Sequence, residues 1–136
     1  MLIKHLGDCA LITANDGCRL RELLHPRKDA VALPYSLAVA YVAPGKRSDP
    51  HFLRQTEVYF ILTGHGLMHI GKEVEPVASG DAVAIPAGQT QWIENAGDET
   101  LEFVAIVSPP WRAEDDIRVD WTPGGIDLLG RSPPHQ

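Results

Sequence analysis

The chain has 136 residues, 44% of them hydrophobic, and a formal net charge of −6. This length fits one domain that can bury a hydrophobic core without disulfide or metal cross-links. Basic residues are scattered in pairs rather than gathered in a stripe, which argues against binding to nucleic acid or to an anionic membrane surface. The first apolar run is too short for a signal peptide, and no stretch approaches the ~18 apolar residues of a membrane helix, so we expect a cytoplasmic protein.

Glycine and proline residues divide the chain into short runs rich in valine, isoleucine, leucine and aromatic residues. Short strands at such spacing are typical of an all-β sandwich or barrel. Helical periodicity is weak and confined to the segments near 112–117 and 125–129. The predicted strands cover residues 2–6, 9–14, 18–24, 35–43, 51–62, 66–70, 73–77, 82–85, 90–95 and 101–107.

Two further predictions concern the turns and the thiols. Asn15-Asp16-Gly17 and the segment 95–98 contain residues that tolerate the positive φ of tight hairpins, so both are predicted turns. Cys9 and Cys18 are not in a CxxC unit, and we expect free thiols, with a disulfide or a metal pair as the alternative.

The composition changes after Ser108-Pro109-Pro110. We therefore predict a β-barrel domain over residues 1–110 and a C-terminal segment over 111–136. That segment is either an arm laid over a partner subunit or a loose tail, because it is turn-rich but carries apolar side chains. These side chains are Trp111, Trp121, Leu128 and Leu129.

The stretch from Gly45 to Gly64 contains the residues best suited to chemistry. His51, Glu57 and Tyr59 share parity, so on an extended chain their side chains point to one face. An imidazole and a carboxyl group facing one space can serve as metal ligands or as an acid and a base.

Two spaced motifs in this chain resemble those of the cupin superfamily. The first, G-x5-H-x-H-x3or4-E-x6-G, is matched by Gly45, His51, Glu57 and Gly64. The second, G-x5-P-x-G-x2-H-x3-N, is matched by Gly80, Pro86, Gly88 and Asn95. The resemblance covers about residues 35–107 and implies a cupin-type jelly-roll β-barrel, in agreement with the all-β pattern, and a homodimer.

The chain departs from both motifs at a histidine. Leu53 replaces the second histidine of the first motif, and Gln91 replaces the histidine of the second. In the family these two histidines bind one divalent metal with the residues that correspond to His51 and Glu57. A reduced set of His51, Glu57 and Gln91 is expected to hold iron, manganese, nickel, copper or zinc less tightly, because a glutamine oxygen is a weak neutral ligand.

Three functions follow from this resemblance and from the residues present. The first is a metal-dependent enzyme of oxygenase, isomerase or lyase type, in which Tyr59 is a candidate acid. The second is a metal-free isomerase or cyclase that uses His51 and Glu57 as acid and base. The third is non-catalytic binding of a small molecule.

The strand alternation also predicts which side chains line the barrel interior. It predicts a mostly apolar cavity for a small organic ligand, with no arginine or lysine inward. His25 is a candidate for the mouth, because an N-terminal strand can cover a barrel opening. The residues predicted to line the interior, besides His51 and Glu57, are Leu53, Tyr59, Ile61, Gln91 and Ile93, with Tyr41, Met68 and Phe103 as further candidates.

Overall fold

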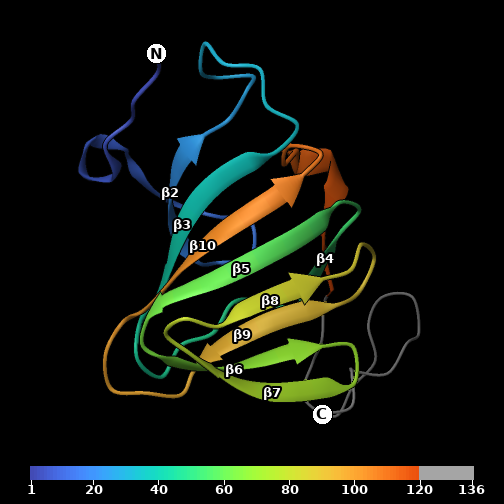
Figure 1. The fold of residues 1–136 in the computed structure, drawn as a ribbon. Coiled ribbons are helices and arrows are strands. Elements are labelled where there is room, and N and C mark those ends of the chain that lie inside the picture. The colour runs from blue at the N-terminus through green and yellow to red at the C-terminus, as the bar shows by residue number, and fades with distance from the viewer. Residues whose placement is uncertain (120–136) are drawn as a thin grey trace.

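A computed structural model describes residues 1–119 and shows an all-β protein built from two antiparallel sheets (Figure 1). This confirms the predicted cupin-type jelly-roll fold. In the six-stranded sheet the order is β1-β2-β3-β10-β5-β8, and in the five-stranded sheet it is β11-β4-β9-β6-β7. Within the described residues the two sheets are not hydrogen-bonded into one closed barrel.

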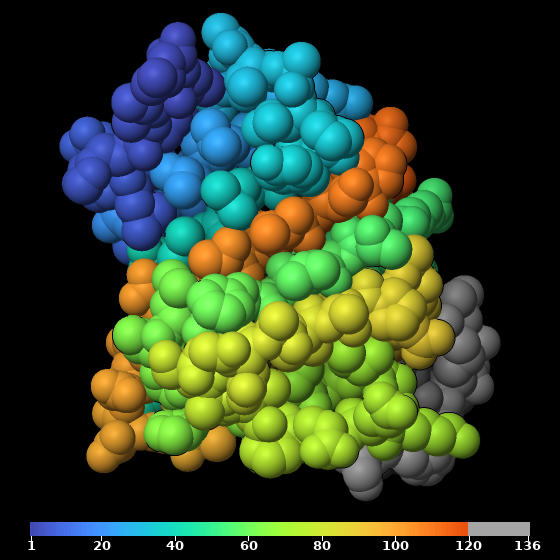
Figure 2. Space-filling view, in the orientation of Figure 1, coloured from blue at the N-terminus to red at the C-terminus, as the bar shows by residue number. Residues whose placement is uncertain are grey.

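The strands of the six-stranded sheet are β1 (Leu11–Thr13), β2 (Arg19–Leu24), β3 (Ser36–Val42), β5 (Thr56–Thr63), β8 (Ala82–Ile85) and β10 (Leu101–Ser108). Those of the five-stranded sheet are β4 (His51–Leu53), β6 (His65–Ile70), β7 (Glu73–Ala78), β9 (Gln91–Asn95) and β11 (Asp116–Arg118). Two single 3-10 turns, η1 (Leu6–Asp8) and η2 (Ala113–Asp115), complete the described secondary structure. β10, β5 and β8 run next to one another across the face seen in Figure 2.

The hydrophobic core lies between the two sheets. Along β5 every second side chain is buried, and Tyr59 and Ile61 point into the core while Val58 and Phe60 are exposed. This is the alternation expected of a strand with one face on the core. The largest fully buried apolar side chains come from β5, β9 and β10 and are Phe103, Ile61, Ile93 and Leu101.

Three predictions of local structure were wrong. Residues 2–6 form no strand; the chain there is exposed and leads into η1. The predicted strand 51–62 is interrupted at Arg54 and Gln55, so that β4 and β5 belong to different sheets. Residues 116–118, predicted as helix or tail, pair with β4 as strand β11.

Two of the motif positions have a structural role that the geometry explains. Gly64 has φ +92°, a conformation that glycine adopts without strain. A Cβ placed on it would lie 3.0 Å from the Cα of Leu101, so only glycine fits at this close approach to β10. The side-chain amide of Asn95 donates to the carbonyl oxygens of Val42 at 2.8 Å and Glu99 at 2.7 Å. It thereby fastens the turn that follows β9 to β3.

The remaining predictions on thiols and termini can be compared directly. Cys9 and Cys18 are free, as predicted, and Cys18 is buried. No helix among residues 1–119 has the length and apolar character needed to cross a membrane. Trp111 is the only one of the four apolar residues of the C-terminal segment that falls within the described residues; Trp121, Leu128 and Leu129 lie outside them.

Candidate functional site

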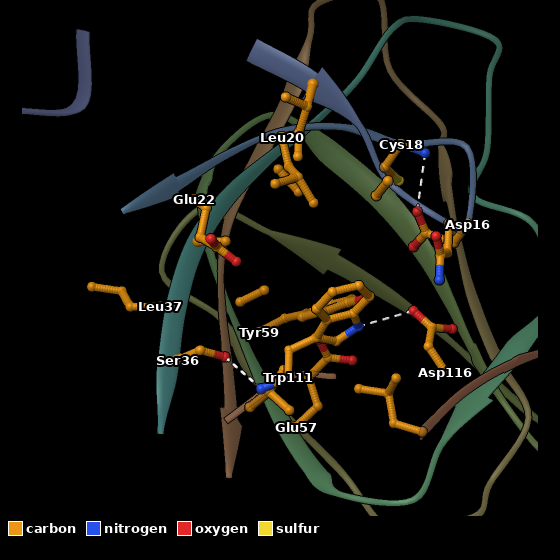
Figure 3. Close-up of a pocket in the computed structure, with 18 of the residues that line it drawn as sticks. Asp16, Cys18, Leu20, Glu22, Ser36, Leu37, Glu57, Tyr59, Trp111 and Asp116 are labelled. Carbon is orange, nitrogen blue, oxygen red and sulfur yellow. Dashed lines mark hydrogen bonds between the residues drawn. The ribbon is translucent and has the colours of Figure 1, made fainter. Parts of the chain in front are cut away.

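A cavity of about 220 Å³ lies between the N-terminal hairpin, the inner face of the six-stranded sheet and the segment that carries Trp111 (Figure 3). Its polar wall is formed by His51, Glu57 and two aspartates, Asp16 and Asp116. The rest of the lining is mostly apolar, which is usual for a small-molecule site. The apolar and aromatic lining includes Ile12, Cys18, Leu20, Leu37, Leu53, Tyr59, Phe103, Val107 and Trp111.

His51 and Glu57 reach this cavity from opposite sheets. His51 begins β4 and Glu57 lies in β5, and both are buried. The prediction that the two face one space is therefore confirmed, although they do not share one strand. The burial alternation continues through the break at 54–55, which is why residue parity still identifies the inward side chains.

Glu57 belongs to a buried hydrogen-bond network. The side-chain amide of Gln91 donates to Glu57 Oε1 at 2.9 Å, and the hydroxyl of Tyr59 donates to Gln91 Oε1 at 3.1 Å. Gln91 is 1% exposed and lies behind the cavity wall. Its two polar atoms are both used, so in this arrangement it orients Glu57 and leaves Glu57 Oε2 for a ligand in the cavity.

The imidazole of His51 is held in place by a hydrogen bond from Nδ1. Nδ1 lies 2.8 Å from the carbonyl oxygen of Asp49, and a carbonyl only accepts, so Nδ1 carries the proton of this bond. In the neutral ring Nε2 is then a proton acceptor. Nε2 lies 3.7 Å from Asp16 Oδ2, too far for a hydrogen bond but close enough for an imidazolium to be stabilised.

The electrostatics of the cavity favour protonated acids. Burial raises the pKa of Glu57 to about 8, and the neighbouring carboxylates of Asp16 and Asp116 add to the rise, while the hydrogen bond from Gln91 opposes it. Burial also raises the pKa of Tyr59 well above its usual value, so its hydroxyl stays neutral. At neutral pH Glu57 therefore carries a proton that it can donate.

Three residues of the site escaped the sequence interpretation. Asp16 lies in the predicted hairpin turn and accepts the backbone N–H of Cys18 at 3.0 Å, a usual turn contact. Asp116 and Trp111 come from the segment 111–136 predicted as an arm or tail, and within its described part, residues 111–119, these two line the cavity. No sequence spacing relates these residues to His51, because the topology of the chain alone brings them together.

The other predicted cavity residues divide into three groups. Leu53, Tyr59 and Phe103 line the cavity. Ile61, Met68 and Ile93 belong to the hydrophobic core, and Tyr41 lies partly exposed outside the lining. Lys28 also borders the cavity, but its side chain is 64% exposed and its Nζ pairs with Glu22 Oε1 at 2.7 Å, so it does not contradict the prediction of no inward lysine.

His25 does not line the cavity but fixes one of its walls. Its Nε2–H donates to the carbonyl oxygen of Trp111 at 2.8 Å, and its Nδ1 accepts the backbone N–H of Arg27 at 3.2 Å. The carbonyl only accepts, so this pair of contacts defines the neutral Nε2–H tautomer. His25 is thus a positioning residue for Trp111.

The donor set does not fit a metal centre in this arrangement. Gln91 Oε1 accepts the Tyr59 hydroxyl, and Leu53 has no ligand atom. Among residues 1–119, no three His, Cys, Asp or Glu side chains are placed so that they could share a metal ion. Metal binding by His51, Glu57 and Gln91 stays a prediction.

Two facing antiparallel sheets with an inward His and Glu place the chain in the class of small jelly-roll β-proteins. The model of the Cupin domain family matches residues 38–107. An uncharacterized protein from Methanocaldococcus jannaschii is 38% identical over 101 residues, which span 74% of this chain and 80% of that protein. The chain belongs to the cupin family.

Two further likenesses concern named enzymes. The acireductone dioxygenase of Stenotrophomonas maltophilia is 37% identical over 84 residues, covering 52% of this chain and 44% of that protein. The structure of the polyketide cyclase RemF from Streptomyces resistomycificus aligns with a TM-score of 0.74 at 20% identity, covering 90% of this chain and 87% of that one. At this identity the second likeness shows the shared fold alone.

Proposed function

We propose that this cupin is a small-molecule enzyme that transfers protons, of the isomerase or cyclase type, with Glu57 as general acid and His51 as general base. The observation that carries the proposal is the buried carboxyl group of Glu57, which Gln91 holds by one oxygen while the other is left for a ligand. An acid whose pKa is close to the working pH is well suited to donate a proton in a transition state.

The residues supply a complete proton path. His51 Nε2 accepts a proton from the bound molecule, and the imidazolium that forms lies near Asp16. Glu57 donates its proton to a second atom of the same molecule, and Gln91 stabilises the resulting carboxylate with its N–H. The molecule gains one proton and loses one, so the net change is an isomerisation or a ring closure, and proton exchange with water then returns His51 and Glu57 to their starting forms. Apolar walls limit access of water to these groups.

The test is a screen of small carbonyl and hydroxyl compounds for turnover by the wild-type protein and by Glu57→Gln. Loss of the acid should lower turnover by about 10²- to 10⁴-fold. Glu75→Gln is the matched control, because Glu75 is exposed on β7 and outside the cavity. Turnover that Glu57→Gln leaves intact would remove the acid role of Glu57.

A metal-dependent enzyme is the second candidate, supported by the family and by the likeness to a dioxygenase over about half of this chain. Elemental analysis after incubation with iron, manganese, nickel, copper and zinc tests it. The double variant Leu53→His with Gln91→His, which restores both motif histidines, is the positive control. Stoichiometric metal in the wild-type protein would favour this candidate, and metal in the double variant alone would reject it.

A further inference from the structure

The charged groups of the cavity are mainly acidic. Asp16 and Asp116, from the β1-β2 turn and β11, face one cavity with His51 and with Glu57, which is protonated at neutral pH. The lysine of the lining, Lys28, is paired with Glu22, and no arginine among residues 1–119 lines the cavity. An anionic ligand would therefore meet repulsion without a compensating cation.

One wall of the cavity is an aromatic side chain in a fixed position. The backbone N–H of Trp111 donates to Ser36 Oγ at 2.9 Å, its carbonyl oxygen accepts from His25, and its indole N–H donates to Asp116 Oδ2 at 3.0 Å (Figure 3). These bonds come from β3, β11 and His25, the residue that follows β2, so Trp111 is positioned by three separate segments.

The bond from the indole to Asp116 leaves an unsatisfied atom. Asp116 Oδ1 is buried and has no hydrogen-bond partner among residues 1–119. A buried carboxylate oxygen without a donor carries a desolvation cost that a ligand's N–H group can remove. His51 and Glu57 are buried residues of the same lining, and the hydrogen bonds that fix them use His51 Nδ1 and Glu57 Oε1 rather than His51 Nε2 and Glu57 Oε2.

On the basis of the proposed function, we propose that the cavity selects small organic molecules that carry a protonated amine, with the ammonium group bound between Asp116 and the face of Trp111. A cation beside a carboxylate and over an indole ring gains from both contacts. A cavity of about 220 Å³ corresponds to roughly seven water molecules at ~30 Å³ each, so the ligand is small. A metal ion fits less well, because the carboxylates do not converge on one point.

The test compares three ligands that share a ring and differ in charge: benzylammonium, benzyl alcohol and benzoate, each titrated into the full chain at pH 7 by calorimetry. We expect benzylammonium to bind about tenfold more tightly than benzyl alcohol, and benzoate to bind more weakly than either. Asp116→Asn should abolish the preference for the amine and leave the affinity for benzyl alcohol unchanged.

Glu114→Gln is the matched control, since it removes a carboxylate from the same segment at an exposed position outside the cavity. If Asp116→Asn does not fold, Trp111→Leu gives a second measure, because it should weaken benzylammonium more than benzyl alcohol. The inference is overturned if benzoate or benzyl alcohol binds as well as the amine, if none of the three binds at millimolar concentration, or if a bound metal excludes the amine.

The ligand titrations and the turnover of Glu57→Gln distinguish a failure of this inference from a failure of the proposed function. Charge preference without an effect of Glu57→Gln on turnover would support the binding site and reject the acid role. Turnover that depends on Glu57 but acts on uncharged compounds with no preference for amines would do the opposite.

Discussion

The carboxyl group of Glu57 is desolvated on folding, and this makes the stability of the protein depend on pH. Its pKa rises from 4.5 to about 8, mainly through burial. Between these values the unfolded chain has released the proton that the native state still holds, so the contribution of Glu57 to stability falls as pH rises through this window. Above the folded pKa the loss is constant, on the order of a few kcal/mol.

Replacing Glu57 by glutamine should remove this dependence. The free energy of unfolding of Glu57→Gln, relative to the wild type, should increase from pH 5 to pH 9 by about a few kcal/mol, because the variant has no carboxyl group to ionise. Urea denaturation at a series of pH values measures the difference. Parallel pH profiles for the two proteins would show that Glu57 ionises normally in the native state.

The candidate site was only partly predictable at the level of single residues. His51, Glu57 and Tyr59 were found because a strand period of two relates them, and that relation survives the break between β4 and β5. Asp16 and Asp116 were missed because aspartates in turns and short terminal strands have ordinary local reasons to be there. Their contribution to the cavity depends on long-range pairing that has no local signature.

At the scale of the element, the described residues that follow β10, 109–119, contribute Trp111 and Asp116 to the wall of the site. β11 pairs with β4, so that Arg118 lies opposite His51. Gln55, between β4 and β5, donates to the carbonyl oxygen of Pro110 and to the carboxylate of Asp115. Composition predicted where this segment begins. It could not predict the attachment, because two partners of Trp111, His25 and Ser36, are far away in the sequence.

His25→Leu should loosen this segment without unfolding the sheets. The change leaves the carbonyl oxygen of Trp111 and the N–H of Arg27 without their partner, at a cost of about 1–3 kcal/mol. Hydrogen exchange should therefore become faster over residues 111–118 and remain unchanged in β10.

His65→Ala is the control for this measurement, because His65 is an exposed histidine at the start of β6, outside the cavity. Equal exchange in the wild type and His25→Leu would mean that the pairing of β11 with β4 holds the segment by itself.

At the scale of the whole molecule, the outer face of the six-stranded sheet is apolar. Val58 is 37% and Phe60 is 42% exposed on β5. Their partners across the ladder on β10 are Ile106 and Val104, and antiparallel partners point to the same side of a sheet. β10, β5 and β8 cross this face of the molecule (Figure 2). Large apolar side chains that lie exposed on neighbouring strands are typical of an interaction surface.

We expect this face to hold two copies of the chain together as a homodimer. A two-fold interface brings the same patch of both copies together, and an exposed phenylalanine near its centre is a favourable anchor.

Phe60→Glu would place a charge there without altering the inward face of β5, where Tyr59 and Ile61 lie. Sedimentation equilibrium should show the mass of a dimer for the wild type and of a monomer for Phe60→Glu, with unchanged circular dichroism. Glu102→Gln, on the same outer face of β10 but across from Thr63 and away from Phe60, should leave the mass unchanged. A monomeric wild type, or a Phe60→Glu variant that still dimerises, would place the interface elsewhere or remove it.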